Sequence, residues 1–527
     1  MKSIMSPQQV FNHVAKPDIQ RSTFDRSHGY KTTFSSGQII PIFLDEALPG
    51  DTFNLKTSVF ARLSTPLKPI MDNIQMDIHY FSVPMRLVWS NFKKFMGEQE
   101  PLTFTAYTIP TITSPAVTGY AEASVYDFMG IPTEVPGLTH SALFNRAYNL
   151  IWNEWYRDEN LQQSAYCPTD DGPDTPGNYI IQARGLRKDY FTSALPFLQK
   201  GTAVTIPLGT TAPIVSNGAS PSFSGHGLTN AVLTAQNGVS GLFVDANATS
   251  SGTISFGNQS GLYADLSTAT ASTINELRQS FQIQRMLEKD ARGGTRYTEK
   301  IRAHFGVISP DARLQRPEFL GGMTTHVSIN PIAQNSATGA TGTTTVQGNL
   351  AATGTLSSVG SGFIKSFTEH EIIIGVASVR ADQTYQQGLN RMWSRSTVYD
   401  FYWPTLSHLG EQSILNKEIY AQGSANAAAD AAVFGYQERY AEYRYKPSIV
   451  TGAFRSNANS GSLDTWHLAY DFSALPALNS TFVSLPPPIA RITAVPSAPE
   501  FLVDCYFDLK TARPMPTYAT PGLIDHF

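Results

Sequence analysis

Histidine beside carboxylates is the first pattern in this chain that could do chemistry. His370 lies between Glu369 and Glu371, the closest approach in the sequence to an acid–base pair or a metal site. On an extended strand, neighbouring side chains point to opposite faces, so both carboxylates would point away from the imidazole. We therefore assign no catalytic residue, metal ligand or cofactor to this triplet.

The sequence signatures of common enzymes are missing. There is no GxxxxGK[ST] phosphate loop and no GxGxxG after a strand, and GxSxG, HExxH and CxxC are absent too. Cys167 and Cys505 are the two cysteines, too few and too far apart in sequence for a disulfide framework or a zinc site. We expect a protein that is not an enzyme.

Aromatic and basic residues are dense in two stretches, 385–403 and 436–446. Rings that stack on bases and arginines that neutralise phosphates are what sequence-neutral binding of single strands needs. The same residue types dominate interfaces between protein subunits, and we favour that explanation over direct contact with DNA. The candidates here are Arg391, Trp393, Arg395, Tyr399, Tyr440, Tyr443 and Arg444.

Strands are the main elements available to position these residues. Two runs between Pro49 and Trp89 alternate apolar and polar residues, as half-buried strands do, and their apolar face needs a second sheet to cover it. The apolar positions are Phe53, Leu55, Thr57 and Val59 in the first run and Ile74, Met76, Ile78 and Tyr80 in the second. Prolines at 66 and 69 predict an extended link between the runs, not a tight hairpin.

Three further strands and two helices follow from the sequence pattern. Residues 38–44 are predicted to form a first strand, 371–379 a strand buried on both faces, and 501–509 an alternating strand. Helices are predicted over 139–160 and from Thr273 to the Gly293-Gly294 pair.

Composition indicates one sheet-rich body with long insertions. Of 527 residues, 15% are charged, and 39 glycines and 33 prolines supply many chain breaks, which suits short strands and long loops. We divide the chain into an N-terminal arm (1–37), a first β segment with a helical insert (38–200), a surface insertion (201–271), a second β segment (272–512) and a C-terminal tail (513–527). The tract 336–362, rich in Ser, Thr and Gly, is interpreted as a loop.

Charge and hydropathy limit the partners. The formal net charge is -4, so contacts with nucleic acid must come from local patches. Arg21, Arg26 and Lys31 in the N-terminal arm are our first candidates for such contacts with DNA. No apolar run is long enough to span a bilayer, and the N-terminus has no signal-peptide core.

Segments spread over nearly the whole chain resemble the major capsid protein of the Microviridae, on the gokushovirus side. They include SHGYKTTF from Ser27, LPGDTFNL from Leu48, RAYNLIWNEWYRDENLQ from Arg146, DYFTSALP from Asp189, ARGGTRYTE from Ala291 and HFGVISPDARLQRPEFLGG from His304. Others are YQQGLNRMWSR from Tyr385, DFYWPTLSHLGEQ from Asp400, NKEIYAQG from Asn416, FGYQERYAEYRYKPS from Phe434 and the C-terminal RPMPTYATPGLIDHF. The resemblance is weakest in 201–271 and 336–362.

The resemblance implies a mainly β protein with an eight-stranded antiparallel jelly roll of the viral capsid type, long loop insertions and a few helices. It also implies a T=1 icosahedral shell of this chain around circular single-stranded DNA, with internal scaffolding, pilot and small DNA-binding phage proteins as partners. The location would be the virion, and the cytoplasm of the bacterial host during assembly. The alternative is a cellular jelly-roll protein that binds other molecules, such as carbohydrates.

The resemblance further implies that the insertion forms a protrusion at the threefold axes, where it would meet a bacterial surface receptor. Its few large or charged side chains are the candidates for contact there: Phe223, Phe243, Asp245, Phe256 and Tyr263. A tract so poor in basic residues cannot neutralise phosphates, so it belongs on the outside of a shell. The alternative is a tolerated surface insertion that has no partner, since loops accept insertions at little thermodynamic cost.

Overall fold

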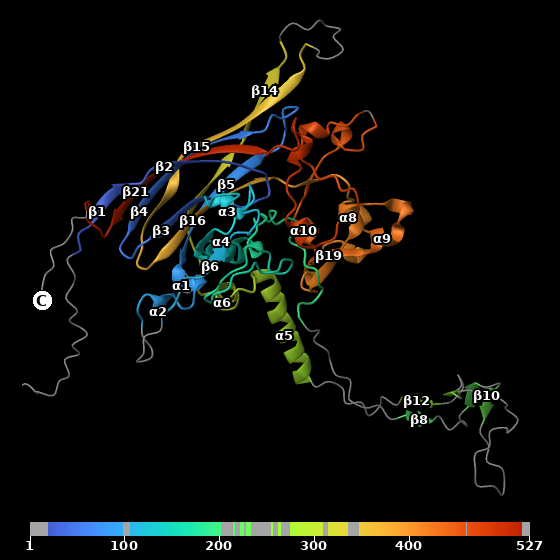
Figure 1. Ribbon diagram of the computed structural model, residues 1–527. Coiled ribbons are helices and arrows are strands. Elements are labelled where there is room, and N and C mark those ends of the chain that lie inside the picture. Colours follow the sequence, from blue (N-terminus) through green and yellow to red (C-terminus); the bar gives the residue numbers. More distant parts are fainter. Residues whose placement is uncertain are drawn as a thin grey trace, which may run out of the picture. The chain divides into compact units, whose positions relative to one another are not determined.

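The computed structural model describes residues 19–98, 106–201, 214–216, 222–225, 228–232, 255–256, 262–264, 274–308, 315–335, 347–459 and 461–518. The chain forms two compact units. Unit 1 comprises Met1–Leu198 and Gly294–Phe527, and unit 2 comprises Gln199–Gly293. Unit 1 is mainly β with a few short helices, and its two large sheets are antiparallel throughout (Figure 1).

The first sheet joins strands from both ends of the chain. Its strands, in spatial order, are β1 (Ser22–Asp25), β21 (Phe501–Arg513), β4 (Thr52–Leu63), β15 (Leu350–Ser366) and β14 (Ser328–Ala333), with β2 (His28–Phe34) also paired to β21. In β21, Phe501, Val503, Cys505, Phe507 and Leu509 are buried while the residues between them face outwards, which confirms the predicted alternation.

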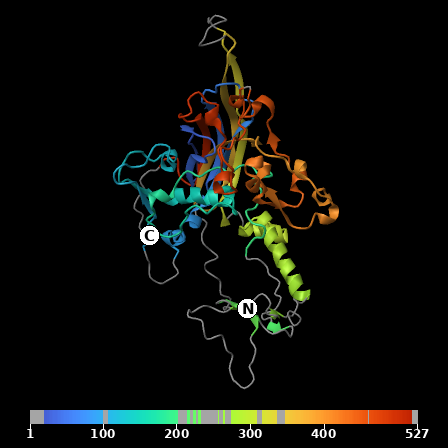
Figure 2. The ribbon, with the colours of Figure 1, turned by 90° about the vertical axis from the view of Figure 1, so that its right-hand side faces the viewer.

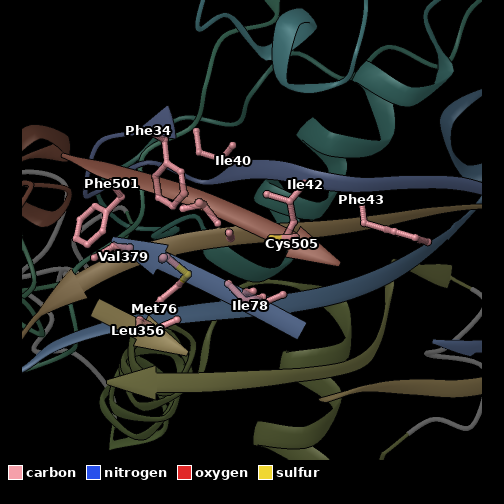
Figure 3. Packing of buried hydrophobic residues seen from close by; sticks show 14 of the residues in the cluster. Phe34, Ile40, Ile42, Phe43, Met76, Ile78, Leu356, Val379, Phe501 and Cys505 are labelled. Carbon is pink, nitrogen blue, oxygen red and sulfur yellow. The ribbon is translucent and has the colours of Figure 1, made fainter. Parts of the chain in front are cut away.

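The second sheet has four strands in the order β13 (Glu318–His326), β5 (Ile74–Pro84), β16 (Glu371–Ala381) and β3 (Ile40–Ala47). The core lies between the two sheets (Figure 3). Phe43 of β3 and Phe507 of β21 have their ring centres 5.1 Å apart across this core. The hydroxyls of Thr57 in β4 and Tyr80 in β5 share a buried hydrogen bond of 2.6 Å. The two amphipathic runs of the sequence therefore lie in facing sheets, and each strand covers the other.

A second core covers the outer face of the second sheet. There Phe81 and Val83 of β5 and Ile372 and Ile374 of β16 pack with α4 (Leu143–Ile151), which lies across the direction of the strands (Figure 2). This confirms that β16 is buried on both faces. The predicted helix 139–160 is shorter than expected, because β7 (Thr139–Ser141) precedes α4 and a π-helical turn, η2 (Trp152–Tyr156), follows it.

Short helices and strands complete this cover. They are α1 (Met85–Val88), α2 (Phe92–Phe95), β6 (Thr111–Thr113), α3 (Val125–Phe128) and η3 (Pro176–Asn178). Arg146 of α4 is fully buried among them, and its guanidinium donates to both carboxylate oxygens of Asp174 at 2.6 and 2.7 Å. A buried guanidinium needs such a bidentate partner, so this ion pair fixes α4 against the loop that carries Asp174.

The segment 384–492 adds a third cluster beside the sheets, largely built from single turns. Its elements are β17 (Thr384–Tyr385), η4 (Arg391–Ser394), η5 (Val398–Asp400), η6 (Pro404–Leu406), β18 (Glu411–Leu415), α8 (Asn416–Ile419), η7 (Gly423–Ala425), α9 (Ala427–Ala431), β19 (Val433–Glu438), η8 (Ala441–Tyr443), β20 (Ser448–Ile449), η9 (Gly452–Phe454), η10 (Asp464–Trp466), α10 (Ser480–Val483) and η11 (Ile489–Arg491). Tyr190, Phe191, Ile414 and Phe482 lie in its buried core.

Two helices follow the predicted insertion. In unit 2, α5 (Ile274–Gly293) confirms the predicted helix, and short strands β8 (Ile214–Ser216), β9 (Ser222–Gly225), β10 (Leu228–Val232), β11 (Ser255–Phe256) and β12 (Leu262–Ala264) precede it. In unit 1, α6 (Tyr297–Phe305) ends at Gly306, which has the left-handed φ of 70° typical of a helix end. No helix among the described residues has the length and apolarity to cross a membrane.

Two sequence expectations were wrong in part. Residues 22–34 are not an irregular arm, because β1 and β2 pair with β21 over their whole length. Tyr30, Thr32 and Phe34 face inwards, but only Phe34 is strongly apolar, so the alternation is weak in the sequence. Residues 1–18 and 519–527, the remainder of the predicted arm and most of the predicted tail, lie outside the described residues.

The second expectation concerned 336–362, interpreted as a loop. From Leu350 onwards this tract is part of β15, paired with β4 and β14, while 336–346 lie outside the described residues. Glycines there allow close approach between strands, since a Cβ on Gly362 would collide with the carbonyl oxygen of Leu55. Small residues thus serve a packed strand here, although their composition is typical of loops.

Candidate subunit interface and nucleic-acid contacts

The loop between β17 and β18 is held in shape by one carboxylate. Asp400 accepts hydrogen bonds from the backbone N–H groups of Ser396 at 2.9 Å and Thr397 at 2.7 Å, and from the Thr397 hydroxyl at 3.0 Å. The two backbone hydrogen bonds are the main reason that the pKa of Asp400 falls to about 2. The loop is therefore a defined structure, although it is made of single turns.

The turn after β19 fixes the same loop from the other side. Arg439 donates to the carbonyl oxygen of Tyr399 at 2.9 Å, and the Tyr440 hydroxyl donates to the same oxygen at 3.2 Å. Within the loop, the indole N–H of Trp403 donates to the carbonyl oxygen of Val398 at 3.0 Å. These contacts hold the backbone of the loop and the indole of Trp403 in place.

Most of these rings face solvent. We define the aromatic surface as Trp393, Tyr399, Phe401, Tyr402, Trp403 and Tyr443, whose exposed fractions run from 49% to 72%. Tyr402 and Tyr443 have their ring centres 6.2 Å apart, and the Arg395 guanidinium lies 4.5 Å from the centre of the Tyr443 ring. Rigid, exposed aromatic side chains of this density are typical of surfaces that another macromolecule covers.

The predicted cations around this surface are paired with carboxylates. Arg391 lies 3.1 Å from Glu418, Arg395 lies 3.8 Å from Glu442, and Arg444 forms an ion pair with Glu438. Burial is the main cause that raises the pKa of Glu418, which also accepts a hydrogen bond from Tyr190 at 2.8 Å. These three guanidinium groups already have anionic partners inside the chain.

Tyr440 needs a correction. Its side chain is only 2% exposed, so its ring is not available to a DNA base. The backbone of Tyr440 has a left-handed φ of 62°, and its ring packs against Tyr402 with centres 5.2 Å apart. Its role in this structure is to support the aromatic surface from beneath.

The N-terminal candidates lie on the first sheet. Arg21 donates to the Thr52 hydroxyl at 3.2 Å, and Arg26 forms a bidentate ion pair with Asp45 at 2.6 and 2.8 Å. Lys31 of β2 faces Asp504 of β21 at 3.1 Å, and both side chains are largely exposed. The three residues are thus not brought together into one basic patch.

Lys31 has neighbours that the sequence analysis missed. It lines a cavity of about 670 Å³ together with Phe60, Arg62 and Leu502, which are outward residues of β4 and β21. The signal was present in the sequence, because Phe60 and Arg62 continue the outward positions of the alternating strand that begins at Thr52.

Comparison with known proteins identifies the family. The family model described as "Capsid protein (F protein)" matches residues 12–523. The chain belongs to this capsid protein family. It is 47% identical to capsid protein VP1 of Bdellovibrio phage phiMH2K over 99% of the chain and 98% of the relative. Capsid protein VP1 of Chlamydia phage 1 is 44% identical to the chain over 97% of each sequence, and that of Spiroplasma virus 4 is 35% identical over 96% of each sequence.

These findings confirm the resemblance to the Microviridae capsid protein, and they replace the alternative of a cellular binding protein. The family is one of structural proteins, not of enzymes. As a capsid protein, the chain assembles into a multimeric shell and is located in the virion. A shell requires extensive contacts between copies, and the aromatic surface is a candidate for one of them.

The His370 triplet has structural partners in this capsid protein. Arg86 donates to Glu369 at 2.8 Å, Lys365 lies 3.5 Å from Glu371, and the His370 carbonyl oxygen accepts from the Met85 backbone. Burial is the main cause that raises the pKa of Glu371. Within the described ranges, no group of three or more His, Cys, Asp and Glu side chains could hold a metal ion.

The candidates for host contact lie in unit 2 of the capsid protein. Phe223, Phe256 and Tyr263 belong to β9, β11 and β12, and Phe223 and Phe256 are directly opposite each other in the β9–β11 ladder. Phe243 and Asp245 lie outside the described residues. Unit 2 includes the whole predicted insertion and α5, which the sequence analysis places in the following segment.

Proposed function

We propose that this chain is a gokushovirus-type major capsid protein whose eight-stranded jelly roll builds a T=1 icosahedral shell around circular single-stranded DNA. The strand order supports the jelly roll. In chain order the eight long strands are β2, β3, β4, β5, β13, β15, β16 and β21, and the sheets read β2-β21-β4-β15 and β3-β16-β5-β13. Strands from the two ends of the chain thus alternate within each sheet, as in two wrapped Greek keys.

The aromatic surface is the observation that carries the proposal for assembly. Asp400, Arg439 and Tyr440 hold the backbone of its loop by hydrogen bonds, yet its rings are exposed to solvent. Covering them with a neighbouring subunit would gain about 25 cal/mol for each Å² of apolar area buried, with little entropy lost in ordering the loop. The ion pairs of Arg391, Arg395 and Arg444 favour a protein partner over DNA, because each guanidinium group already has a carboxylate partner, although the buried Nε–H of Arg395 has no acceptor.

Substitution of Trp393 tests this proposal. We expect Trp393→Ala to raise the protein concentration needed for shell assembly at least about tenfold, because removal of a central aromatic contact costs about 2 kcal/mol or more. Trp393→Phe keeps a ring and should retain much of the assembly. Sedimentation velocity of the purified variants measures the fraction in particles, and unchanged assembly of Trp393→Ala would contradict the proposal.

Contact with the genome is proposed for the face of the first sheet that points away from the core between the sheets, near Lys31. Lys31 and Arg62 are the cations there, beside the carboxylates of Glu122, Asp127 and Asp504, and Phe60 offers an exposed ring for stacking. Arg21, Arg26 and the residues of the aromatic surface remain candidates for DNA contact. We expect the double variant Lys31→Gln/Arg62→Gln to lose packaged DNA at lower salt than the parent protein. The same salt profile for both would remove this face as a DNA contact.

Host attachment is proposed for the insertion 201–271, which would protrude at the threefold axes and meet a bacterial receptor. Phe223, Phe243, Asp245, Phe256 and Tyr263 are the candidate contacts. Assembly would take place in the host cytoplasm with internal scaffolding, pilot and small DNA-binding phage proteins. Replacing 201–271 by a short Gly/Ser linker should give shells that form but no longer adsorb to the host cell. Shells that still adsorb would contradict this role.

A further inference from the structure

A cavity of about 270 Å³ in unit 1 is lined by four cationic side chains to which no function has yet been assigned. They are Arg157, Arg184, Lys188 and Arg380. The walls come from the end of η2, the segment 184–192, β16 and α10, so distant parts of the chain converge here. Asp158 is the one carboxylate among the lining residues, and the lining does not overlap with the aromatic surface.

The charges around this cavity do not balance. Behind it, the buried carboxylate of Asp77 faces two guanidinium groups, Arg380 at 2.8 Å and Arg184 at 3.4 Å. Asp158 forms an ion pair with Lys188. The four cations therefore have two carboxylates, which leaves an excess of two positive charges next to a cavity whose Arg184 and Arg380 side chains are only 15% and 22% exposed.

Two donors at the cavity have no acceptor in the described part of the chain. They are the buried Nε–H groups of Arg157 and Arg184, whereas the Nε–H of Arg380, which also lacks a well-aligned hydrogen bond, lies 2.8 Å from a carboxylate oxygen of Asp77. Arg157 otherwise donates to the carbonyl oxygen of Gln162 at 3.1 Å, and the Arg184 guanidinium lies 4.7 Å from the centre of the Tyr156 ring. Buried donors in folded proteins normally have acceptors, so these two groups are available to an acceptor that enters the cavity, either water or an anion.

The neighbouring histidine adds no charge to this arrangement. His79 has its Nδ1 2.8 Å from the Tyr156 hydroxyl, and its pKa falls to about 4 because it is buried and, secondly, because Arg184 is close. His79 is therefore neutral near pH 7. The positive excess therefore comes from the arginine and lysine side chains alone.

We propose that this cavity is a binding site for a phosphate group. A phosphate monoester or inorganic phosphate carries a charge of about -1.5 to -2 at neutral pH, which matches the excess of positive charge. Its oxygens can accept from both unused Nε–H groups, since guanidinium groups suit the geometry of phosphate oxygens. The phosphate could come from free phosphate or a nucleotide in solution, or from the packaged DNA of the proposed function.

Calorimetric titration of the full-length protein with sodium phosphate, at constant ionic strength maintained with chloride, tests the site. We expect phosphate to bind to the parent protein, and to bind at least about tenfold more weakly to Arg157→Gln, because a hydrogen bond between charged groups is lost. Arg184→Lys keeps the positive charge next to Asp77 and should weaken binding as well, since lysine lacks the planar fork. Circular dichroism of both variants checks that they are folded.

Arg187→Gln is the matched control. Arg187 is next to Lys188 in the chain, but it pairs with Asp382 at 3.2 Å and does not line the cavity. Its phosphate affinity should equal that of the parent protein. No phosphate binding by the parent protein, or the same affinity in Arg157→Gln, Arg184→Lys and Arg187→Gln, would overturn the proposal.

Competition separates the sources of the phosphate. If thymidine 5′-monophosphate displaces phosphate and an oligothymidylate without terminal phosphates does not, the ligand is a free phosphate monoester or inorganic phosphate. If the oligothymidylate displaces phosphate and Arg157→Gln abolishes this effect, the site holds the DNA backbone. Either result supports the site. The titration with sodium phosphate contains no DNA. Its result therefore tests the site even if the proposed DNA packaging is wrong.

Discussion

The two-sheet sandwich and the aromatic surface use the same kinds of side chain in opposite ways. In the sandwich, Phe43, Phe53 and Phe507 are at most 1% exposed and belong to the core between the sheets, where the rings of Phe43 and Phe507 pack across it. In the aromatic surface, Trp393 and Tyr399 are 72% and 67% exposed, although their loop is firmly hydrogen-bonded. The aromatic side chains of the sandwich are buried within one chain, whereas those of the aromatic surface are left exposed for contact with another macromolecule.

This difference reflects the backbone of each region. Strands of the sandwich pair along their whole length, so their side chains alternate between core and solvent. The loop 391–409 has single turns without a regular period, and its shape depends on side-chain acceptors such as Asp400. Substitutions that affect folding and assembly separately therefore test this difference between the two regions.

The largest effect is expected in the sandwich. Phe507→Ala should lower the free energy of unfolding by about 3 to 5 kcal/mol, because it opens a cavity beside Phe43 and His28. Tyr506→Ala is the control, since its neighbouring side chain is 53% exposed and points out of the sheet. It should change stability by no more than about 0.5 kcal/mol. Urea unfolding of unassembled protein measures both, and equal losses would contradict the assignment of the two faces.

A smaller and local effect is expected in the loop of the aromatic surface. Asp400→Ala removes the acceptor for the Ser396 and Thr397 N–H groups and should destabilise the loop by about 1 kcal/mol, as loss of a helix cap does. Hydrogen exchange of residues 396–400 should become faster, while exchange in β21 should stay unchanged. Faster exchange in both regions would show that the loop and the sandwich are not independent.

The smallest effect is a dependence on pH. The pKa of Asp400 is lowered from 3.8 to about 2, so its ionised form stabilises the loop above about pH 4, and this contribution is lost as the pH falls towards 2. Loop protection should decrease over this range in the parent protein. Asp400→Asn, which cannot titrate, should show no such decrease. The same profile in both proteins would assign the transition to another group.

Regular periodicity made much of the sandwich predictable. The alternation in β21 and the continuous apolar run in β16 gave the correct strands from residues alone. β2 was missed because Thr32, a polar residue, faces inwards. Most of β15 was missed because Gly354 and Gly362 allow close packing against neighbouring strands, which the local sequence does not show. The local sequence does not show which strand will pair with a given segment.

The candidate sites were predictable by residue type but not by pairing. Trp393, Tyr399 and Tyr443 were identified from aromatic density, and they are exposed. The buried state of Tyr440 and the ion pair of Arg26 with Asp45 could not be predicted, since both depend on tertiary contacts that the local sequence pattern does not show. The cavity lined by Arg157 and Arg380 was missed for the same reason, because its residues are more than two hundred positions apart.

Radical footprinting of Trp393 and Tyr399 tests the central claim most directly, with three samples compared: unassembled protein, empty shells and DNA-filled shells. If the aromatic surface is an interface between subunits, both side chains should be modified readily in the unassembled protein and protected equally in both kinds of shell. Equal modification in all three samples would contradict the claim. Protection only in DNA-filled shells would contradict it as well, and would assign the aromatic surface to the genome.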